Sequence, residues 1–289
     1  MSAVPPLGYS SWTRYTEDSY AAAQHVALHV GRLQRHFGRL PVVYFHDYLA
    51  DGLTTLDGAY EAVFGSIAST GYPVITPRLV SNSQWANPAV VDAGGAVDDA
   101  IEWAHDQPWI ATREDKVVVY GVGMGSLNAL NWAWRNPGKI AAVVLVGPIV
   151  DADAFYTDNV ALQTPINAAW GSGAAWTAAL PTIDPMANLD LIRPFAHKIG
   201  LWYGASDTEI DPSDVQAFAQ LTGATAYQFE GTASTRHLVP SDAVAAFAMA
   251  TLRDRARAYV GWDAADVARF TEFPITIPAD PAARHVNVL

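Results

Sequence analysis

The stretch VVVYGVGMGSLNALNWAW, residues 117–134, contains a β-branched apolar run, a glycine-rich turn and a helix-compatible segment. This order predicts a buried strand that passes through a tight turn directly into a helix. The turn has the spacing Gly-x-Gly-x-Gly, formed by Gly121, Gly123 and Gly125. The residues around such a turn, and those elsewhere in the chain, decide what chemistry it serves.

Strand-like and helix-like segments alternate along the rest of the chain. The predicted strands are 40–47, 72–77, 116–121, 141–147, 198–204 and 224–230. Their continuous apolar character predicts an α/β fold with a mostly parallel sheet covered on both faces. Residues 148–197 are longer than a crossover needs, which predicts an inserted cap, with an irregular helical connection as the alternative.

Composition excludes several classes of function. A net charge of −12 with 17 basic residues argues against nucleic-acid binding, and the absence of cysteine excludes thiol catalysis and disulfides. The histidines lack metal-like partners, so we expect neither a metal nor a cofactor. No apolar run reaches the roughly 18–20 residues of a membrane span, and no signal peptide is evident. We therefore expect a soluble protein, either cytoplasmic or virion-associated.

Three glycine motifs compete for the turn. A phosphate-binding Walker loop needs a lysine that is missing here, and a dinucleotide fingerprint needs a third glycine where Ser126 stands. The third motif is Gly-x-Ser-x-Gly, the nucleophile elbow, with Gly123 in place of the serine. Downstream, Asp207 follows strand 198–204 and His237 lies in the loop after strand 224–230.

The residues upstream complete the pattern. The segment HDY, residues 46–48, is similar to the His-Gly-x segment beside such an elbow, with Asp47 in place of glycine. Residues 38–257 therefore resemble the α/β-hydrolase superfamily of esterases and lipases. The resemblance implies a hydrolase fold of about eight strands with a cap at about 148–197. Outside this core we expect an N-terminal segment, 1–37, that packs on the core, and the proline-rich tail predicts an extended arm, 258–289.

The resemblance also assigns roles to individual residues. It implies that Asp207 and His237 are the acid and base, Met124 and Tyr48 the oxyanion donors, and Gly121 and Gly125 the elbow glycines, while Gly123 lacks the nucleophilic side chain. Taken alone, Asp207 also fits a carboxylate that caps its own turn. Ser126 is a substitute nucleophile by residue type, but its place one turn into the helix should direct it away from the pocket.

Two functions from different classes follow. The first is a catalytically inactive pseudo-hydrolase with a binding or structural role, for instance a virion or tail component of an actinobacterial virus. Its partners would be other protein subunits, or a small acyl or glycan-like ligand. The alternative is a carboxylic ester hydrolase of the esterase or lipase type. It would be a nucleophile-less variant, or one in which His237 and Asp207 activate water.

Overall fold

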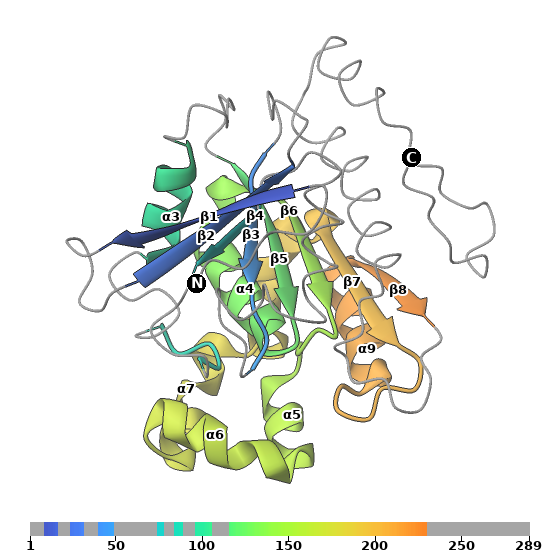
Figure 1. Cartoon of the computed structure of the whole chain (residues 1–289). Coiled ribbons are helices and arrows are strands. Elements are labelled where there is room, and N and C mark those ends of the chain that lie inside the picture. The colour runs from blue at the N-terminus through green and yellow to red at the C-terminus, as the bar shows by residue number, and fades with distance from the viewer. Residues whose placement is uncertain are drawn as a thin grey trace.

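The computed structural model describes residues 9–16, 24–31, 40–48, 74–77, 84–88, 96–105 and 116–229 (Figure 1). The strands are β1 (Tyr9–Thr16), β2 (Gln24–Gly31), β3 (Val42–Phe45), β4 (Val74–Pro77), β5 (Val117–Val122), β6 (Ile140–Val146), β7 (Ile199–Gly204) and β8 (Thr225–Phe229). The helices are α3 (Ala96–His105), α4 (Met124–Arg135), α5 (Ala152–Asp158), α6 (Val160–Trp170), α7 (Gly173–Ile183), α8 (Leu189–Ile192) and α9 (Pro212–Thr222). Short 3-10 turns are η3 (Pro137–Lys139), η4 (Met186–Asn188) and η5 (Arg193–Lys198).

Within these ranges the strands form one eight-stranded sheet in the order β1-β2-β4-β3-β5-β6-β7-β8. Strands β3 to β8 pair in parallel, which confirms the predicted mostly parallel sheet of about eight strands. The six strands expected from the sequence are all present, with ends shifted by at most two residues. β1 and β2 come from the segment 1–37 and extend the sheet by antiparallel pairing, which the sequence did not predict.

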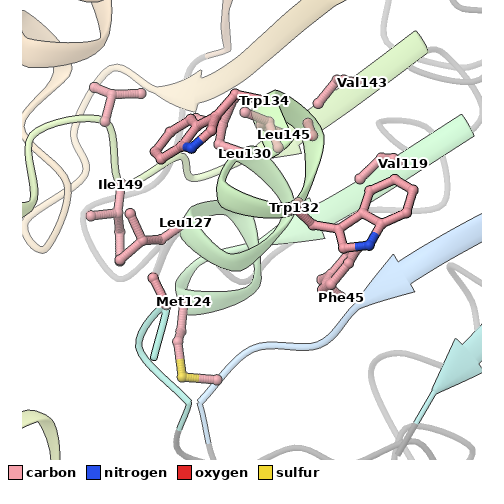
Figure 2. Close-up of a cluster of buried hydrophobic side chains, with 14 of the residues drawn as sticks. Phe45, Val119, Met124, Leu127, Leu130, Trp132, Trp134, Val143, Leu145 and Ile149 are labelled. Atoms are coloured by element: carbon pink, nitrogen blue, oxygen red, sulfur yellow. The ribbon is translucent and has the colours of Figure 1, made fainter. Parts of the chain in front are cut away.

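The centre of the sheet is buried on both faces. Every residue of β3, β5, β6 and β7 is buried, which explains why these strands read as continuous apolar runs. Helix α4 packs on β5, and each of its residues except Arg135 is buried. Figure 2 shows Trp132 of this helix beside Phe45 of β3, with ring centroids 6.4 Å apart. The elbow therefore lies between two of the most deeply buried elements.

A helical insert separates β6 from β7. Its helices α5, α6 and α7 lie beyond the carboxyl ends of the parallel strands (Figure 1). The Asn131 side chain of α4 donates to the Ile183 carbonyl at 2.8 Å, and the Trp170 indole donates to the Trp85 carbonyl at 3.0 Å. The predicted cap is thus present, and these hydrogen bonds are among those that hold it to the core. The outer limits proposed for the core, 38–257, and the arm after it stay predictions, since residues 230–289 lie outside the described ranges.

Two elbow glycines are required by close packing. A Cβ on Gly121 would lie 2.5 Å from the Gly125 carbonyl oxygen, at the start of α4. A Cβ on Gly125 would overlap the Phe45 carbonyl oxygen and lie 2.5 Å from that of His46. Real Cβ atoms do not approach backbone so closely, and backbone cannot rotate away as a flexible side chain can. Gly125 therefore lets the end of β3 lie directly against the first turn of α4, and Gly121 lets the end of β5 do the same.

Replacing Gly125 by alanine should therefore destabilise the protein strongly. We expect Gly125→Ala to lower the free energy of unfolding by at least about 3 kcal/mol, the upper range for overpacking a core. Urea denaturation measures the change. Gly138→Ala is the matched control, because a Cβ there meets nothing within 4 Å, and it should change stability by less than about 1 kcal/mol. Equal stability of the two variants would contradict the close packing of β3 on α4.

Candidate functional site

The elbow has the backbone geometry of a sharp strand-to-helix turn. Gly123 stands between β5 and α4 with φ 53° and ψ −121°, and its N–H donates to the Val146 carbonyl at 3.0 Å. This positive φ is the strained conformation that the resemblance to a nucleophile elbow implies at position 123. Glycine adopts this conformation without the steric cost that a side chain would meet. The chain therefore has the backbone conformation of an elbow, with no side chain at position 123.

Ser126 does not replace the missing hydroxyl. Its side chain is fully buried and donates to the Gly123 carbonyl at 2.5 Å. The same oxygen accepts the Ile149 N–H at 2.9 Å, which ties the turn to the segment after β6. As expected, the hydroxyl is turned into the protein. With its donor and an acceptor position already used, Ser126 is a structural residue of the elbow.

A carboxylate stands where an oxyanion hole was expected. The Met124 N–H donates to Asp47 Oδ1 at 2.8 Å, and Asp47 is only 3% exposed. Asp47 lies two residues after the end of β3, and that strand pairs with β5 in the register Phe45↔Gly121. The second predicted oxyanion residue, Tyr48, packs its ring on Trp85 at a centroid distance of 5.4 Å. The amide of Met124, which sequence reasoning assigned to an oxyanion, already has a partner within the chain.

Behind the elbow lies a buried polar network that sequence reasoning missed. The Gln84 amide nitrogen lies 3.0 Å from His46 Nε2, and its oxygen accepts from the Asn128 side chain at 2.7 Å. Asn128 Oδ1 in turn accepts the Ala86 N–H at 2.7 Å. All three side chains are buried. The signal in the sequence was Asn128 in a mostly apolar helix, because a buried amide needs partners.

This network holds a strained turn. Trp85 and Ala86 have φ of 45° and 57°, a region that costs a residue with a side chain about 1–3 kcal/mol. The hydrogen bonds to Ala86 N–H and to the Trp85 carbonyl keep the turn in place from both sides. Trp85 is thereby packed between Tyr48 and Phe155, with centroid distances of 5.4 Å and 6.0 Å. The turn forms an aromatic contact between the end of β3 and the cap.

Asp207 lies after β7, at the sheet edge where the sequence placed it. Its Oδ1 accepts the N–H groups of Glu209 and Ile210 at 2.9 Å and 3.0 Å. This carboxylate therefore caps its own turn, which was the alternative interpretation of the residue. His237 lies outside the described residues. The acid–base pair of Asp207 and His237 stays a prediction.

Between the start of the cap and the β7–α9 loop is a cavity of about 340 Å³. Asp207 lines it, whereas Gly123 and Met124 do not. Six lining residues carry carboxylates and none carries a basic side chain: Asp151, Asp158, Asp207, Glu209, Asp211 and Asp214. Burial raises the pKa of Asp214, and the charges of Asp151, Asp211 and Asp158 raise it further. The cavity is therefore an acidic environment that disfavours anions.

The described residues hold no group of three His, Asp or Glu side chains arranged to bind a metal ion. Among the helices of this part of the chain, none combines the length and the apolar character needed to cross a membrane.

Comparison with solved structures gives the fold. The brefeldin A esterase, a bacterial homologue of human hormone-sensitive lipase, superposes with a TM-score of 0.63 at 16% identity, over 87% of this chain and 78% of that one. A fluorophosphonate-binding serine hydrolase of Staphylococcus aureus superposes with a TM-score of 0.60 at 15% identity, over 86% of this chain and 98% of that one. The S-formylglutathione hydrolase of Agrobacterium tumefaciens superposes with a TM-score of 0.58 at 14% identity, over 86% of this chain and 94% of that one.

The chain has the α/β-hydrolase fold. No protein-family model matches the sequence, and no curated protein matches it either. At identities of 14–16% the structural likeness establishes the fold alone. The resemblance inferred from the elbow and its surroundings is thereby confirmed at the level of an esterase-like hydrolase fold. The roles of individual residues still rest on their own geometry.

A buried carboxyl group, that of Asp184, joins the two ends of the cap in this hydrolase fold. Asp184 ends α7 and accepts the N–H groups of Ala152, at the start of the cap, and Met186 at 2.9 Å and 3.2 Å. Burial raises the pKa of the Asp184 carboxyl to about 6, although these hydrogen bonds act in the opposite direction. The charges of Asp151 and Asp153 raise it as well. Asp184 thus joins the two ends of the cap at a cost in charge burial.

We expect Asp184→Asn to stabilise the protein at pH 7. A carboxyl with a raised pKa in the folded state contributes stability below its unfolded pKa and loses it as pH rises through about 6. Asparagine keeps the acceptor without the charge, so the gain should be about 1–2 kcal/mol at pH 7 and should shrink towards pH 4. Denaturant unfolding across this range measures it. Glu102→Gln, at an exposed position of α3 away from the acidic cavity, is the control. A gain that does not depend on pH would contradict the assignment.

Proposed function

We propose that this chain is a pseudo-hydrolase, which binds a ligand in a hydrolase fold but forms no acyl-enzyme. The observation that carries this proposal is Gly123, which holds the elbow conformation at φ 53° without a hydroxyl. Covalent acyl transfer needs a nucleophile beside a base, and glycine offers none. The nearest serine in sequence, Ser126, already binds the Gly123 carbonyl and the Ile149 N–H. Both features support a site without a covalent nucleophile.

The ligand we infer is small and is either neutral or cationic. The cavity of about 340 Å³ beside Asp207 has the size of a small-molecule site. Its carboxylates would repel an acid or a phosphate but accept hydrogen bonds from hydroxyl groups. A neutral acyl ester or a glycan-like ligand meets these conditions. Partner subunits and a place in a virion or tail stay predictions, as does the compartment.

A second function is an ester hydrolase in which His237 and Asp207 activate water. The structural neighbours favour it, because those named above are an esterase, a serine hydrolase and an S-formylglutathione hydrolase. Asp207 also stands after β7, at the carboxyl edge of the sheet. Water activation needs no residue at position 123. A pseudo-hydrolase and such an enzyme differ in a measurable way, because only the enzyme turns esters over.

The unmodified protein should show neither labelling by a fluorophosphonate nor hydrolysis of p-nitrophenyl butyrate above the spontaneous rate. The reason is the absence of a hydroxyl at the elbow. Labelling is measured on the folded chain by intact mass, and a melting curve confirms that the sample is folded. Labelling that disappears in Ser126→Ala would show a serine enzyme and overturn the proposal. Hydrolysis without labelling would establish the water-activating alternative.

Binding is tested separately by thermal denaturation with neutral methyl butyrate and with its anionic counterpart, butyrate. A ligand at a hundred times its Kd stabilises the folded state by about 2.7 kcal/mol. We expect the neutral ester to raise the melting temperature and butyrate to leave it unchanged, because the cavity is lined by carboxylates. An equal shift with butyrate would contradict the acidic character of the site.

A further inference from the structure

A hydrogen bond between residues 77 positions apart in the sequence joins the segment after β3 to the elbow. It runs from the Met124 N–H, at the first position of α4, to Asp47 Oδ1 at 2.8 Å, and both residues are buried. The N–H after the nucleophile position is half of the oxyanion hole in this fold. A substrate oxyanion would need the same N–H at the same distance. Asp47 Oδ1 therefore lies where that oxygen would lie.

The surroundings of Asp47 fix it in this position. Gly125 lets the Phe45 and His46 carbonyls lie against the first turn of α4, so the residue after them reaches the helix end. His46 Nδ1 lies 2.9 Å from the Asp47 carbonyl oxygen, and its Nε2 lies 3.0 Å from the Gln84 amide nitrogen. The backbone that carries Asp47 is thus held on two sides. A carboxylate held at a helix N-terminus is also favoured by the dipole of that helix.

We propose that Asp47 is an internal ligand of the oxyanion hole and a second block to acyl transfer, independent of Gly123. The inference rests on the proposed pseudo-hydrolase function and extends it. A tetrahedral oxyanion cannot take the Met124 N–H while Asp47 holds it, and its negative charge would stand beside that of the carboxylate. A serine restored at position 123 would attack an ester without this donor. Loss of one oxyanion-hole donor costs about 10²–10³ in kcat.

The test compares the wild type, Gly123→Ser, Asp47→Gly and the double variant Gly123→Ser/Asp47→Gly. The measurements are the rate of fluorophosphonate labelling and kcat for p-nitrophenyl acetate. We expect Gly123→Ser to stay within about tenfold of the wild type. The double variant should exceed it by about 10²-fold or more, because the Met124 N–H is then free. The single variant Asp47→Gly should stay inert, since it has no nucleophile.

Gly123→Ser/Asp47→Asn is the matched control. Asparagine can keep an oxygen on the Met124 N–H but has no charge, so the block by occupancy should persist and activity should stay near that of Gly123→Ser. The amide proton shift of Met124 gives a readout that is independent of activity. It should move upfield in Asp47→Gly, where the charge-assisted hydrogen bond is lost, and far less in Asp47→Asn.

Each contrary result overturns a definite statement. If Gly123→Ser alone matches the double variant, or if the folded double variant stays inert, Asp47 is not the block, while the pseudo-hydrolase proposal stands. An unchanged Met124 shift in Asp47→Gly would likewise refute the internal ligand. If the unmodified protein hydrolyses esters and Asp47→Asn abolishes this, Asp47 is a catalytic residue, and both proposals fail.

Discussion

The close approach of the end of β3 to the first turn of α4 is the contact on which the site depends. It exists because Gly125 has no side chain to keep the Phe45 and His46 carbonyls away, while Gly121 lets the end of β5 approach the same turn of α4. From this contact follow the position of Asp47 on the Met124 N–H and the packing of the Phe45 ring beside that of Trp132. The same few residues thus connect the packing of the core to the chemistry of the elbow. An added methyl group there disturbs both at once.

Much of the fold could be predicted from the sequence, because it depends on local patterns. Buried parallel strands are apolar throughout, and their helices alternate with them, so six strands and α4 were found within two residues of their observed ends. β1 and β2 were missed because β1, with the sequence YSSWTRYT, is largely polar. Its pairing with β2 in an antiparallel ladder is a long-range feature that no local period reveals.

The candidate site was predicted only in outline. Positive φ at Gly123 follows from the resemblance to a nucleophile elbow, and the turned-away Ser126 follows from its place one turn into the helix. The bond from Met124 to Asp47 could not be derived, because it depends on the register of β3 against β5 and on the side-chain direction of a single residue. The same holds for Gln84, which meets Asn128 across 44 positions. Such contacts are properties of the packed structure and leave no period in the sequence.

The glycine at position 123 and the aspartate at position 47 are energetically consistent with each other. In an active elbow the nucleophile has a strained backbone, which lowers the stability of the folded state by about 1–3 kcal/mol. Catalysis requires the nucleophile in that conformation. Glycine removes that strain. Without a nucleophile at position 123, the Met124 N–H has no oxyanion to bind. A buried N–H without a partner would cost about 1–3 kcal/mol, and Asp47 satisfies it at the helix end where a carboxylate is most favoured. Under the proposed function, each of these two residues stabilises the folded chain, and each would remove one requirement for acyl transfer. A protein whose ligand only has to bind gains stability from both changes, whereas an esterase would lose its nucleophile through one and its oxyanion donor through the other.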